Sequence, residues 1–349
     1  FATEDNHTEF FQEVMKWGDE QFFKSKLALN TKDTDKEYVN AEDAFAHLFN
    51  KKDLSQIQEA VLWKKYSVAD GVFHRLGALL ASGAVDGQGP SGLSKSLVDN
   101  YLNADGTFIN PKDEKYKDFN EMFKERDARL LVTVMHSGPD CKYRASSPTN
   151  KPMNVRAYDA TGTEDEMKEK NEDIVSPNLN GDGNSKSVTG FHIRLGIDTT
   201  YVDNESETVV VLFRYAEGLL CYAEAAEELD LCTDDVLNKT LKPLRERAGV
   251  TYVKPTKADP NFPFTGLSPV LQEIRRERRS ELALQGFRLD DLMRWAVAGT
   301  LKGQDGRGRG AYLGEDGVLY KSFSPKGRES LKLVLKDNDG WTDPLQQYL

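Results

Sequence analysis

One predicted helix places acidic side chains on its apolar face, and this limits how the rest of the chain can fold. Pro269 is typical of a first helical turn, and Gly286 is typical of a helix end. At the helical period, Glu277 and Glu281 fall on the same stripe as Ile274. A buried carboxylate is costly unless it is paired or hydrogen-bonded. The fold must therefore bring cationic partners to these two glutamates.

Arginine is the abundant candidate partner. Within the helix, Arg278 lies beside the apolar stripe, whereas Arg275, Arg276 and Arg279 point elsewhere. Neighbouring helices offer further arginines: Arg214, Arg245, Arg247, Arg288 and Arg294. We predict a structural ion-pair network that locks helix pairs together, and its members are Glu277, Arg278, Glu281, Arg214 and Arg288. A catalytic carboxylate pair is the alternative, but both acids would then face packed helices instead of a cleft.

The charge of the chain argues against nucleic acid as the main partner. The formal net charge is −11 over 349 residues, whereas phosphate binding needs a basic field over at least one face. The arginines of residues 275–279 are interleaved with Glu273, Glu277 and Glu281, so the local surplus of positive charge is small. With 38% hydrophobic residues, the composition is that of a folded protein that buries a real core.

The sequence offers little for a metal or a membrane-spanning helix. The cysteines and histidines follow no metal-ligand spacing, so we predict no metal and no cofactor. No apolar run approaches the roughly 18 residues that a spanning helix needs. Phe1 opens directly into an amphipathic segment, so we expect no signal peptide within these residues.

Helical periodicity predicts a mainly α fold. Two successive helix–turn–helix pairs near the C-terminal end suggest a tetratricopeptide-like layer, in which Thr233 caps one helix, Pro243 bends or splits it and Gly249 ends it. A strand is predicted over 59–67. The predicted helices cover residues 8–29, 41–49, 209–229, 234–248, 269–285 and 288–298.

Between residues 68 and 208 the periodicity fades into Gly-, Pro-, Asn- and Ser-rich segments. Long ordered loops are where ligands usually bind, so a ligand site is expected here. "NLNGDGN" (178–184) resembles the start of a calcium loop, but Thr189 stands where the ligating glutamate is expected, so a polar turn is the better interpretation. "GRGRG" (306–310) lacks the context of a phosphate loop and indicates a surface loop.

Several motifs resemble the SusD/RagB family. "LQEIRRERRSELALQGFRLDDLMRW" (271–295) is similar to its C-terminal signature, although Gln285 stands where the family usually has glutamate. "VVLFRYAEGLLCYAEAAEEL" (210–229) resembles a second family element. "FKERDARL" resembles its R-D-P-R-L turn with Ala128 in place of proline. The other two similar elements are "GFHIRL" (190–195) and "LRERAGV" (244–250).

The resemblance implies a non-catalytic lipoprotein on the cell-surface face of a Gram-negative outer membrane. Such a protein captures oligosaccharides, or in some members peptides, and covers a SusC-like TonB-dependent transporter as a lid. It needs no cofactor, and it contacts the membrane only through an N-terminal lipid anchor, which we expect to be absent from this chain. Residues 1–349 are expected to form one SusD-like domain that is incomplete at both ends. Its parts are a helical segment (1–58), a loop-rich ligand-binding region with short strands (59–208), helix pairs (209–299) and a loop-rich tail (300–349).

A glycan site of this kind needs aromatic faces for the sugar rings and polar groups for the hydroxyls. Phe73 and Phe191 are further aromatic candidates, while Trp63 is expected in the core. The predicted ligand-binding residues are Tyr66, His74, Tyr101, Tyr143, Tyr158 and Asp159.

Two other functions stay open. A glycoside hydrolase needs two carboxyl groups about 5–10 Å apart in a cleft, and sequence spacing shows no such pair. A helical-repeat scaffold explains the helix pairs but not the long loop-rich middle. Within the family, capture of peptides is the alternative, and the acidic balance favours cationic ones.

Overall fold

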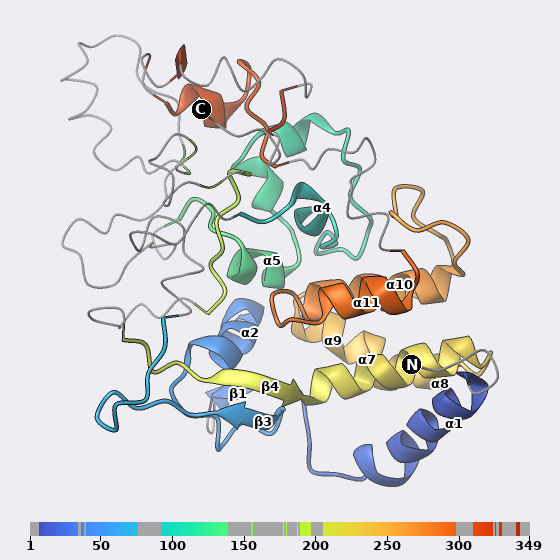
Figure 1. The fold of residues 1–349 in the computed structure, drawn as a ribbon. Helices are drawn as coiled ribbons and strands as arrows, with labels where there is room; N and C mark the ends of the chain where they lie inside the picture. Colours follow the sequence, from blue (N-terminus) through green and yellow to red (C-terminus); the bar gives the residue numbers. More distant parts are fainter. Residues whose placement is uncertain are drawn as a thin grey trace.

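Most of the regular structure is helical, and helices α7 to α11 gather with α1 on one side of the molecule (Figure 1). The rest of the described chain is loop with short helices and two small two-stranded sheets. The computed structural model describes residues 7–33, 36–37, 40–75, 92–138, 155, 177, 179, 187, 189–196, 205–297, 310–323, 325, 328–329 and 340–342.

Helix α7 (Tyr215–Glu228) is the centre of the helical side, with α1 (His7–Trp17) against one face. Its alanines and leucines are buried, as the helical stripe in the sequence predicts. The contact with residues 18–22, which follow α1, is close because glycines face rings. A Cβ added at Gly218 would lie 2.4 Å from the Phe22 ring.

Helix α1 is shorter than the predicted segment 8–29. After Trp17 the chain makes one π-helical turn, Gly18–Phe22, and then leaves helical structure. A Cβ at Gly18 would lie 2.3 Å from the Tyr222 ring, so the backbone approaches α7 closely at this point. Tertiary packing, rather than the apolar period, therefore sets the end of the helix.

Helices α8 (Asp234–Lys239) and α9 (Leu241–Arg247) come from one predicted helix. The Thr233 side chain accepts a hydrogen bond from the Val236 amide at 3.4 Å and caps α8, as predicted. Pro243 lies in the first turn of α9, where its missing amide is tolerated. The prediction that this proline splits the helix is confirmed.

Helix α10 (Pro269–Glu281) packs on α7. Its start is as predicted, because Ser268 Oγ accepts from the Leu271 amide at 3.0 Å. The helix ends before Gly286, since Leu284 and Gly286 both adopt positive φ, of 63° and 92°. Helix α11 (Arg288–Arg294) follows this turn.

The strand β3 (Ala60–Lys64) pairs antiparallel with β4 (Val210–Arg214). The prediction of a helix from residue 209 is therefore wrong for residues 210–214. These residues are rich in β-branched side chains, and a partner far away in the sequence completes the sheet. Strand β3 is also shorter than the predicted 59–67. Helix α2 (Ala41–Asn50) contacts β4.

The loop-rich part has its own hydrophobic core. The largest cluster of buried apolar side chains includes Val98, Leu130, Phe191 and Leu319. The prediction of a mainly helical fold, with helix pairs against a loop-rich region and short strands, is confirmed. The remaining elements are β1 (Lys32–Asp33), β2 (Lys36–Glu37), α4 (Lys95–Val98), 3-10 helices Glu114–Lys117 and Glu121–Phe123, α5 (Ala128–Thr133) and α12 (Val318–Lys321).

Candidate functional site

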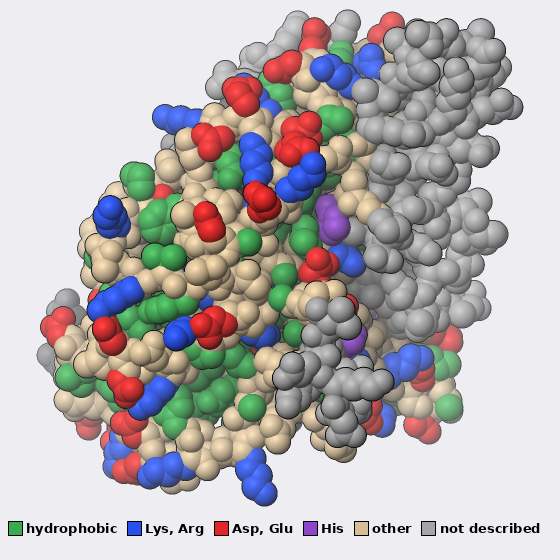
Figure 2. Space-filling view, turned by 180° about the vertical axis from the view of Figure 1, so that it is seen from behind, with side chains coloured by type: hydrophobic (Ala, Val, Ile, Leu, Met, Phe, Trp, Pro, Cys, Tyr) green, Lys and Arg blue, Asp and Glu red, His purple; other side chains and the backbone are tan. Residues whose placement is uncertain are grey.

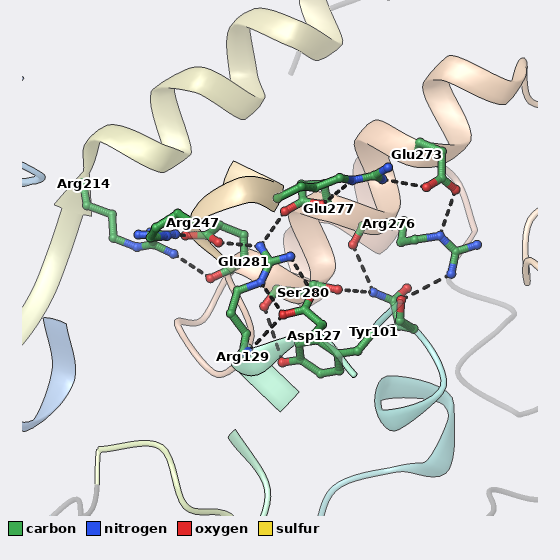
Figure 3. Close-up of polar contacts among 12 residues, drawn as sticks. Tyr101, Asp127, Arg129, Arg214, Arg247, Glu273, Arg276, Glu277, Ser280 and Glu281 are labelled. Atoms are coloured by element: carbon green, nitrogen blue, oxygen red, sulfur yellow. Dashed lines mark hydrogen bonds and ion pairs between the residues drawn. The ribbon is translucent and has the colours of Figure 1, made fainter. Parts of the chain in front are cut away.

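A chain of buried ion pairs runs along α10 and joins it to α5, to the end of β4 and to α9 (Figure 3). Arg129 of α5 reaches between two turns of α10, where its Nη1 donates to Glu277 Oε1 at 2.5 Å and to Glu281 Oε2 at 2.6 Å. The same guanidinium donates to Asp127 Oδ2 at 2.6 Å. All four side chains are buried. This interaction fixes the loop-rich region against the helix layer.

The chain of ion pairs continues from Glu281 to Arg214 and Arg247, and through them to Glu59. Arg214, the residue before α7, donates to Glu281 Oε1 at 2.5 Å and to Glu59 Oε1 at 2.7 Å. Arg247 of α9 donates to Glu281 Oε1 and, at 2.8 Å, to Glu59 Oε2. Glu281 therefore binds three guanidinium groups, and Glu59 binds two of the same three.

In the other direction the pairs follow α10 toward its first turn. Arg245 of α9 donates to Glu277 Oε2 at 3.0 Å and to Glu273 Oε2 at 2.6 Å. Arg276 then joins Glu273 at 2.8 Å to Asp259 at 2.6 Å. Among the described residues the arginine–carboxylate network comprises Glu59, Asp127, Arg129, Arg214, Arg245, Arg247, Asp259, Glu273, Arg276, Glu277 and Glu281.

Electrostatics explain why Glu281 and Glu273 stay charged. Burial by itself would raise the pKa of Glu281, but Arg247, Arg214 and Arg129 outweigh burial and hold that pKa well below its ordinary value. Burial opposes Arg276 and Arg245 in the same way at Glu273, and its pKa is also lowered. Proton donors in catalysis need a raised pKa at neutral pH. Glu281 and Glu273 have the opposite property, and their chemistry is that of structural ion pairs.

The structure joins Glu277, Glu281 and Arg214 of the predicted network, but it separates Arg278. Arg278 Nε donates to both oxygens of Asp291, at 2.8 and 2.9 Å, and so connects α10 to α11. Arg294, which the sequence offers as a partner, pairs with Glu224 at 2.7 Å. These two pairs form a smaller group on the α7, α10 and α11 side.

Arg288 is the member of the predicted network that the structure does not pair. Within the described part of the chain, no carboxylate lies within 4 Å of its guanidinium, which instead faces the rings of Phe264 and Trp295 at 5.6 and 5.7 Å. Arg276, predicted to point elsewhere, is a buried network member. The helical wheel fails here because α9 and the segment around Asp259 cover the other face of α10.

Six network members escaped sequence reasoning: Glu59, Asp127, Arg129, Asp259, Glu273 and Arg276. Asp127 and Arg129 lie inside the "ERDARL" motif, so the motif was noted but its contact with α10 was not. For Glu59 the sequence has no signal, because its partner Arg214 is far away along the chain. Neighbours of this kind become visible only in three dimensions.

Two of the predicted ligand-binding residues, Tyr66 and His74, come together on an exposed hairpin. Ser67 and Val72 exchange backbone hydrogen bonds of 2.7 and 2.9 Å, and Gly71 supplies the positive φ that the turn requires. The Tyr66 and His74 rings meet edge to face with centroids 4.5 Å apart. We call residues 66–74 the aromatic hairpin.

The aromatic hairpin is anchored on one side and open on the other. The His74 backbone exchanges hydrogen bonds with Ser206, and its Nε2 lies 2.7 Å from the Thr208 carbonyl oxygen. The Lys64 ammonium lies over the Tyr66 ring, 5.0 Å from its centroid. Phe73 is 41% exposed, with Val68 and Val72 also exposed beside it. In Figure 1 this segment lies at the lower left, beyond β3 and away from the helix layer.

Tyr101, another predicted ligand-binding residue, lies in the core. Its side chain is fully buried, and its hydroxyl donates to Thr133 Oγ1 at 3.1 Å. Phe191 is buried in the same core cluster, so it too presents no face to a sugar. Trp63 packs against a core cluster, as expected. Three predicted ligand-binding residues, Tyr143, Tyr158 and Asp159, lie outside the described residues.

Other classes of site find no support in the part of the chain that is described. No group of His, Cys, Asp and Glu side chains is arranged to hold a metal ion there. Of the helices described, none is both long and apolar enough to span a bilayer. On the face drawn in Figure 2, basic and acidic side chains of the described residues are interspersed, instead of forming the basic surface that nucleic acid requires.

The SusD family model matches residues 54–332, and the chain belongs to this family. The fold is similar to that of a SusD-like carbohydrate binding protein from Bacteroides fragilis, with a TM-score of 0.59 and 21% sequence identity over 96% of this chain and 55% of that chain. A second SusD-like protein from Bacteroides fragilis has a TM-score of 0.56 and 18% identity, over 88% of this chain and 55% of that chain. The chain thus spans about half the length of these structures. Curated proteins give no match.

Proposed function

We propose that the protein is a non-catalytic, cell-surface binding protein that captures oligosaccharides. The observation that carries this proposal is membership of the SusD family over residues 54–332. The similar Bacteroides fragilis structure, described as a carbohydrate binding protein, supports it. We further propose that the protein is a lipid-anchored protein of the outer membrane and passes its cargo to a SusC-like TonB-dependent transporter.

The aromatic hairpin supports a role in binding. Sugar rings present apolar faces that stack on aromatic side chains, while their hydroxyls need nearby polar groups. Phe73 offers an exposed ring, and Asp70 and Lys64 lie on the same exposed segment. The Tyr66 ring already contacts Lys64 and His74, so these contacts fix its position rather than leave it loose. We propose Phe73, Tyr66 and His74 as part of the ligand-binding surface.

The state of the buried acids supports the non-catalytic part. Glycosidases use two available carboxyl groups, one of them with a raised pKa. Burial raises the pKa of Glu217, against the opposing charges of Arg278 and Arg214. Asp291, the acid whose charge acts on it, is already bonded to Arg278 and Arg294. Asp291 is therefore not available as the second carboxyl group that a glycosidase would need beside Glu217.

Isothermal titration against a panel of oligosaccharides and peptide pools tests the proposal, with chromatography of each mixture after long incubation. We expect one glycan class to bind and to be recovered intact. Binding of peptides alone would replace the cargo with oligopeptides under the same capture mechanism. Cleavage of a bound glycan would overturn the non-catalytic assignment and direct attention to Glu217.

The transporter partner needs its own experiment. We expect the protein, purified from outer membranes under mild detergent, to bring a TonB-dependent transporter with it. Labelling of intact cells should also modify the protein, because the proposal places it on the outer face. A protein that is protected from the label and purifies alone would contradict this part of the proposal.

A further inference from the structure

A pocket lies between the segment that precedes α4 and the turn that joins α10 to α11. Its volume is about 540 Å³, which falls within the range of small-molecule sites. Leu93, Leu97, Leu282 and Phe287 supply apolar walls. The pocket is distinct from the aromatic hairpin, since no residue of 66–74 lines it.

Three arginines line this pocket: Arg278, which is buried and paired with Asp291, and Arg279 and Arg288, which are both half-buried. Within the described chain neither Arg279 nor Arg288 forms an ion pair, although nearly every other arginine of α10 and α11 does. Arg279 Nη2 donates to Ser96 Oγ at 2.9 Å. Arg288 Nη1 is buried and donates to no acceptor. A buried donor without an acceptor is costly, and native structures leave few of them.

The positive charge of Arg288 also disfavours the charged form of Arg279. Burial and the charge of Arg288 lower the pKa of Arg279 to about 9. Burial lowers the pKa of Arg288 to about 10, against the charge of Asp291. Both groups remain charged at neutral pH. The Asp291 carboxylate lines the pocket as well, but this carboxylate already accepts hydrogen bonds from Arg278 and Arg294.

An anion in the pocket would offer an acceptor to the guanidinium groups that line it and would offset the repulsion that the charge of Arg288 exerts on Arg279. Carboxylate is well matched to guanidinium, because the two planar groups form paired hydrogen bonds. The leucine and phenylalanine walls would leave the hydroxyls of a sugar without partners, and this costs free energy. The walls favour an aliphatic body next to the carboxylate.

We propose that this pocket binds a small organic carboxylate with an apolar body, such as the C-terminal aliphatic residue of a peptide. Arg279 and Arg288 would hold the carboxylate, and Leu93, Leu97, Leu282 and Phe287 would surround the aliphatic part. This site goes beyond the proposed capture of oligosaccharides and does not depend on it.

The first test uses three probes in an NMR titration of the full chain. N-acetyl-leucine carries both features, N-acetyl-leucinamide lacks the charge, and glucuronate lacks the apolar body. We expect N-acetyl-leucine to bind at least about tenfold more tightly than either other probe, the ratio expected for a hydrogen bond to a charged group. Equal binding of the amide would overturn the role of the arginines. Equal binding of glucuronate would overturn the role of the apolar walls.

Variants then test whether the ligand binds at Arg279 and Arg288. Arg288→Gln and Arg279→Gln should each weaken binding of N-acetyl-leucine by about tenfold. Arg75→Gln removes an exposed guanidinium outside the lining, so it should leave binding unchanged. Thermal unfolding of each variant shows whether it is folded, and two separate arginine variants keep the test valid if one is not. Unchanged affinity in either folded variant would overturn the proposal, whatever the result with oligosaccharides.

Discussion

The arginine–carboxylate network and the aromatic hairpin lie in the same chain but use their side chains in opposite ways. In the network, every carboxylate is buried and bound to at least one guanidinium. In the hairpin, Phe73, Val68 and Val72 are exposed, and the anchoring bonds come mostly from the backbone. A buried ion pair is expensive to break, whereas an exposed ring is available to a ligand. The comparison fits a stabilising role for the network and the proposed binding role for the hairpin.

Glu281 is the side chain whose loss should damage the fold most. Glu281→Gln removes the charge that holds three buried guanidinium groups. We expect it to lower the free energy of unfolding by about 3–5 kcal/mol, the loss typical of a broken buried pair. Urea denaturation followed by circular dichroism measures this change.

Glu246→Gln is the matched control, because it makes the same substitution at an exposed glutamate that lies 3.8 Å from Lys242. Its effect should stay within about 1 kcal/mol. Equal effects at the two positions would mean that the network adds nothing beyond surface electrostatics.

The pH dependence of stability should show the same network. Opposite charges hold the pKa values of Glu281 and Glu273 below their unfolded value of about 4.3. Their stabilising contribution is complete above that pH and is lost as the pH falls toward the folded values. Glu281 should lose about 2 kcal/mol by pH 3, and Glu273 should lose stability in the same direction. Urea titrations at pH 7, 5, 4 and 3 should therefore show a smaller decline for Glu281→Gln than for the native protein. Parallel declines would contradict the assignment.

On the hairpin side, Phe73→Ala should reduce glycan affinity without reducing stability. We expect a loss of about 1–2 kcal/mol in binding, as for aromatic side chains at the centre of an interface. Phe10→Ala, at an exposed phenylalanine of α1, is the control and should change neither quantity. Titration calorimetry with the best oligosaccharide gives the affinities. A Phe73→Ala variant with native affinity would remove the hairpin from the ligand-binding surface.

Tyr101→Phe tests whether Tyr101 acts in the core or in ligand binding. The sequence alone predicts it to be a ligand-binding residue, whereas the structure buries it. The change deletes the hydroxyl that donates to Thr133 Oγ1. Stability should fall by about 1 kcal/mol, while glycan affinity should stay the same. A loss of affinity in a folded variant would restore Tyr101 to the binding surface.

Gln285→Glu should have the smallest effect, although it restores the residue usual in the family. Gln285 Oε1 accepts from Arg214 Nε at 2.9 Å, and its Nε2 donates to the Glu281 carbonyl oxygen at 2.9 Å. A glutamate would strengthen the first bond and lose the second. The net change in the free energy of unfolding should stay within about 1 kcal/mol. A larger loss would show that the amide donor matters more than the charge.

Local patterns predicted much of the fold. The capping of α8 and α10, the break at Pro243 and the burial of Glu277 and Glu281 all follow from residues close together in the sequence. Strand β4 did not follow, because a run of valines fits a helix and a strand equally well. Its partner β3 lies in a distant part of the sequence. Non-local pairing is the information that a single sequence leaves out.

The candidate sites were harder to predict for the same physical reason. Tyr66 and His74 meet because a tight hairpin brings them together, which a local pattern can suggest. Tyr101 has the same aromatic character, yet contacts with α5 and α10 bury it. Composition shows which side chains suit a ligand, but only the packing shows which of them are exposed.

The most direct test measures two quantities on two variants, Glu281→Gln and Phe73→Ala. For each, urea denaturation gives the free energy of unfolding, and calorimetry gives the affinity for the bound oligosaccharide at a temperature where both variants are folded. We predict that Glu281→Gln loses stability and keeps its affinity, while Phe73→Ala loses affinity and keeps its stability. Loss of affinity in the folded Glu281→Gln variant, together with native affinity in Phe73→Ala, would place the binding chemistry in the network and contradict the account.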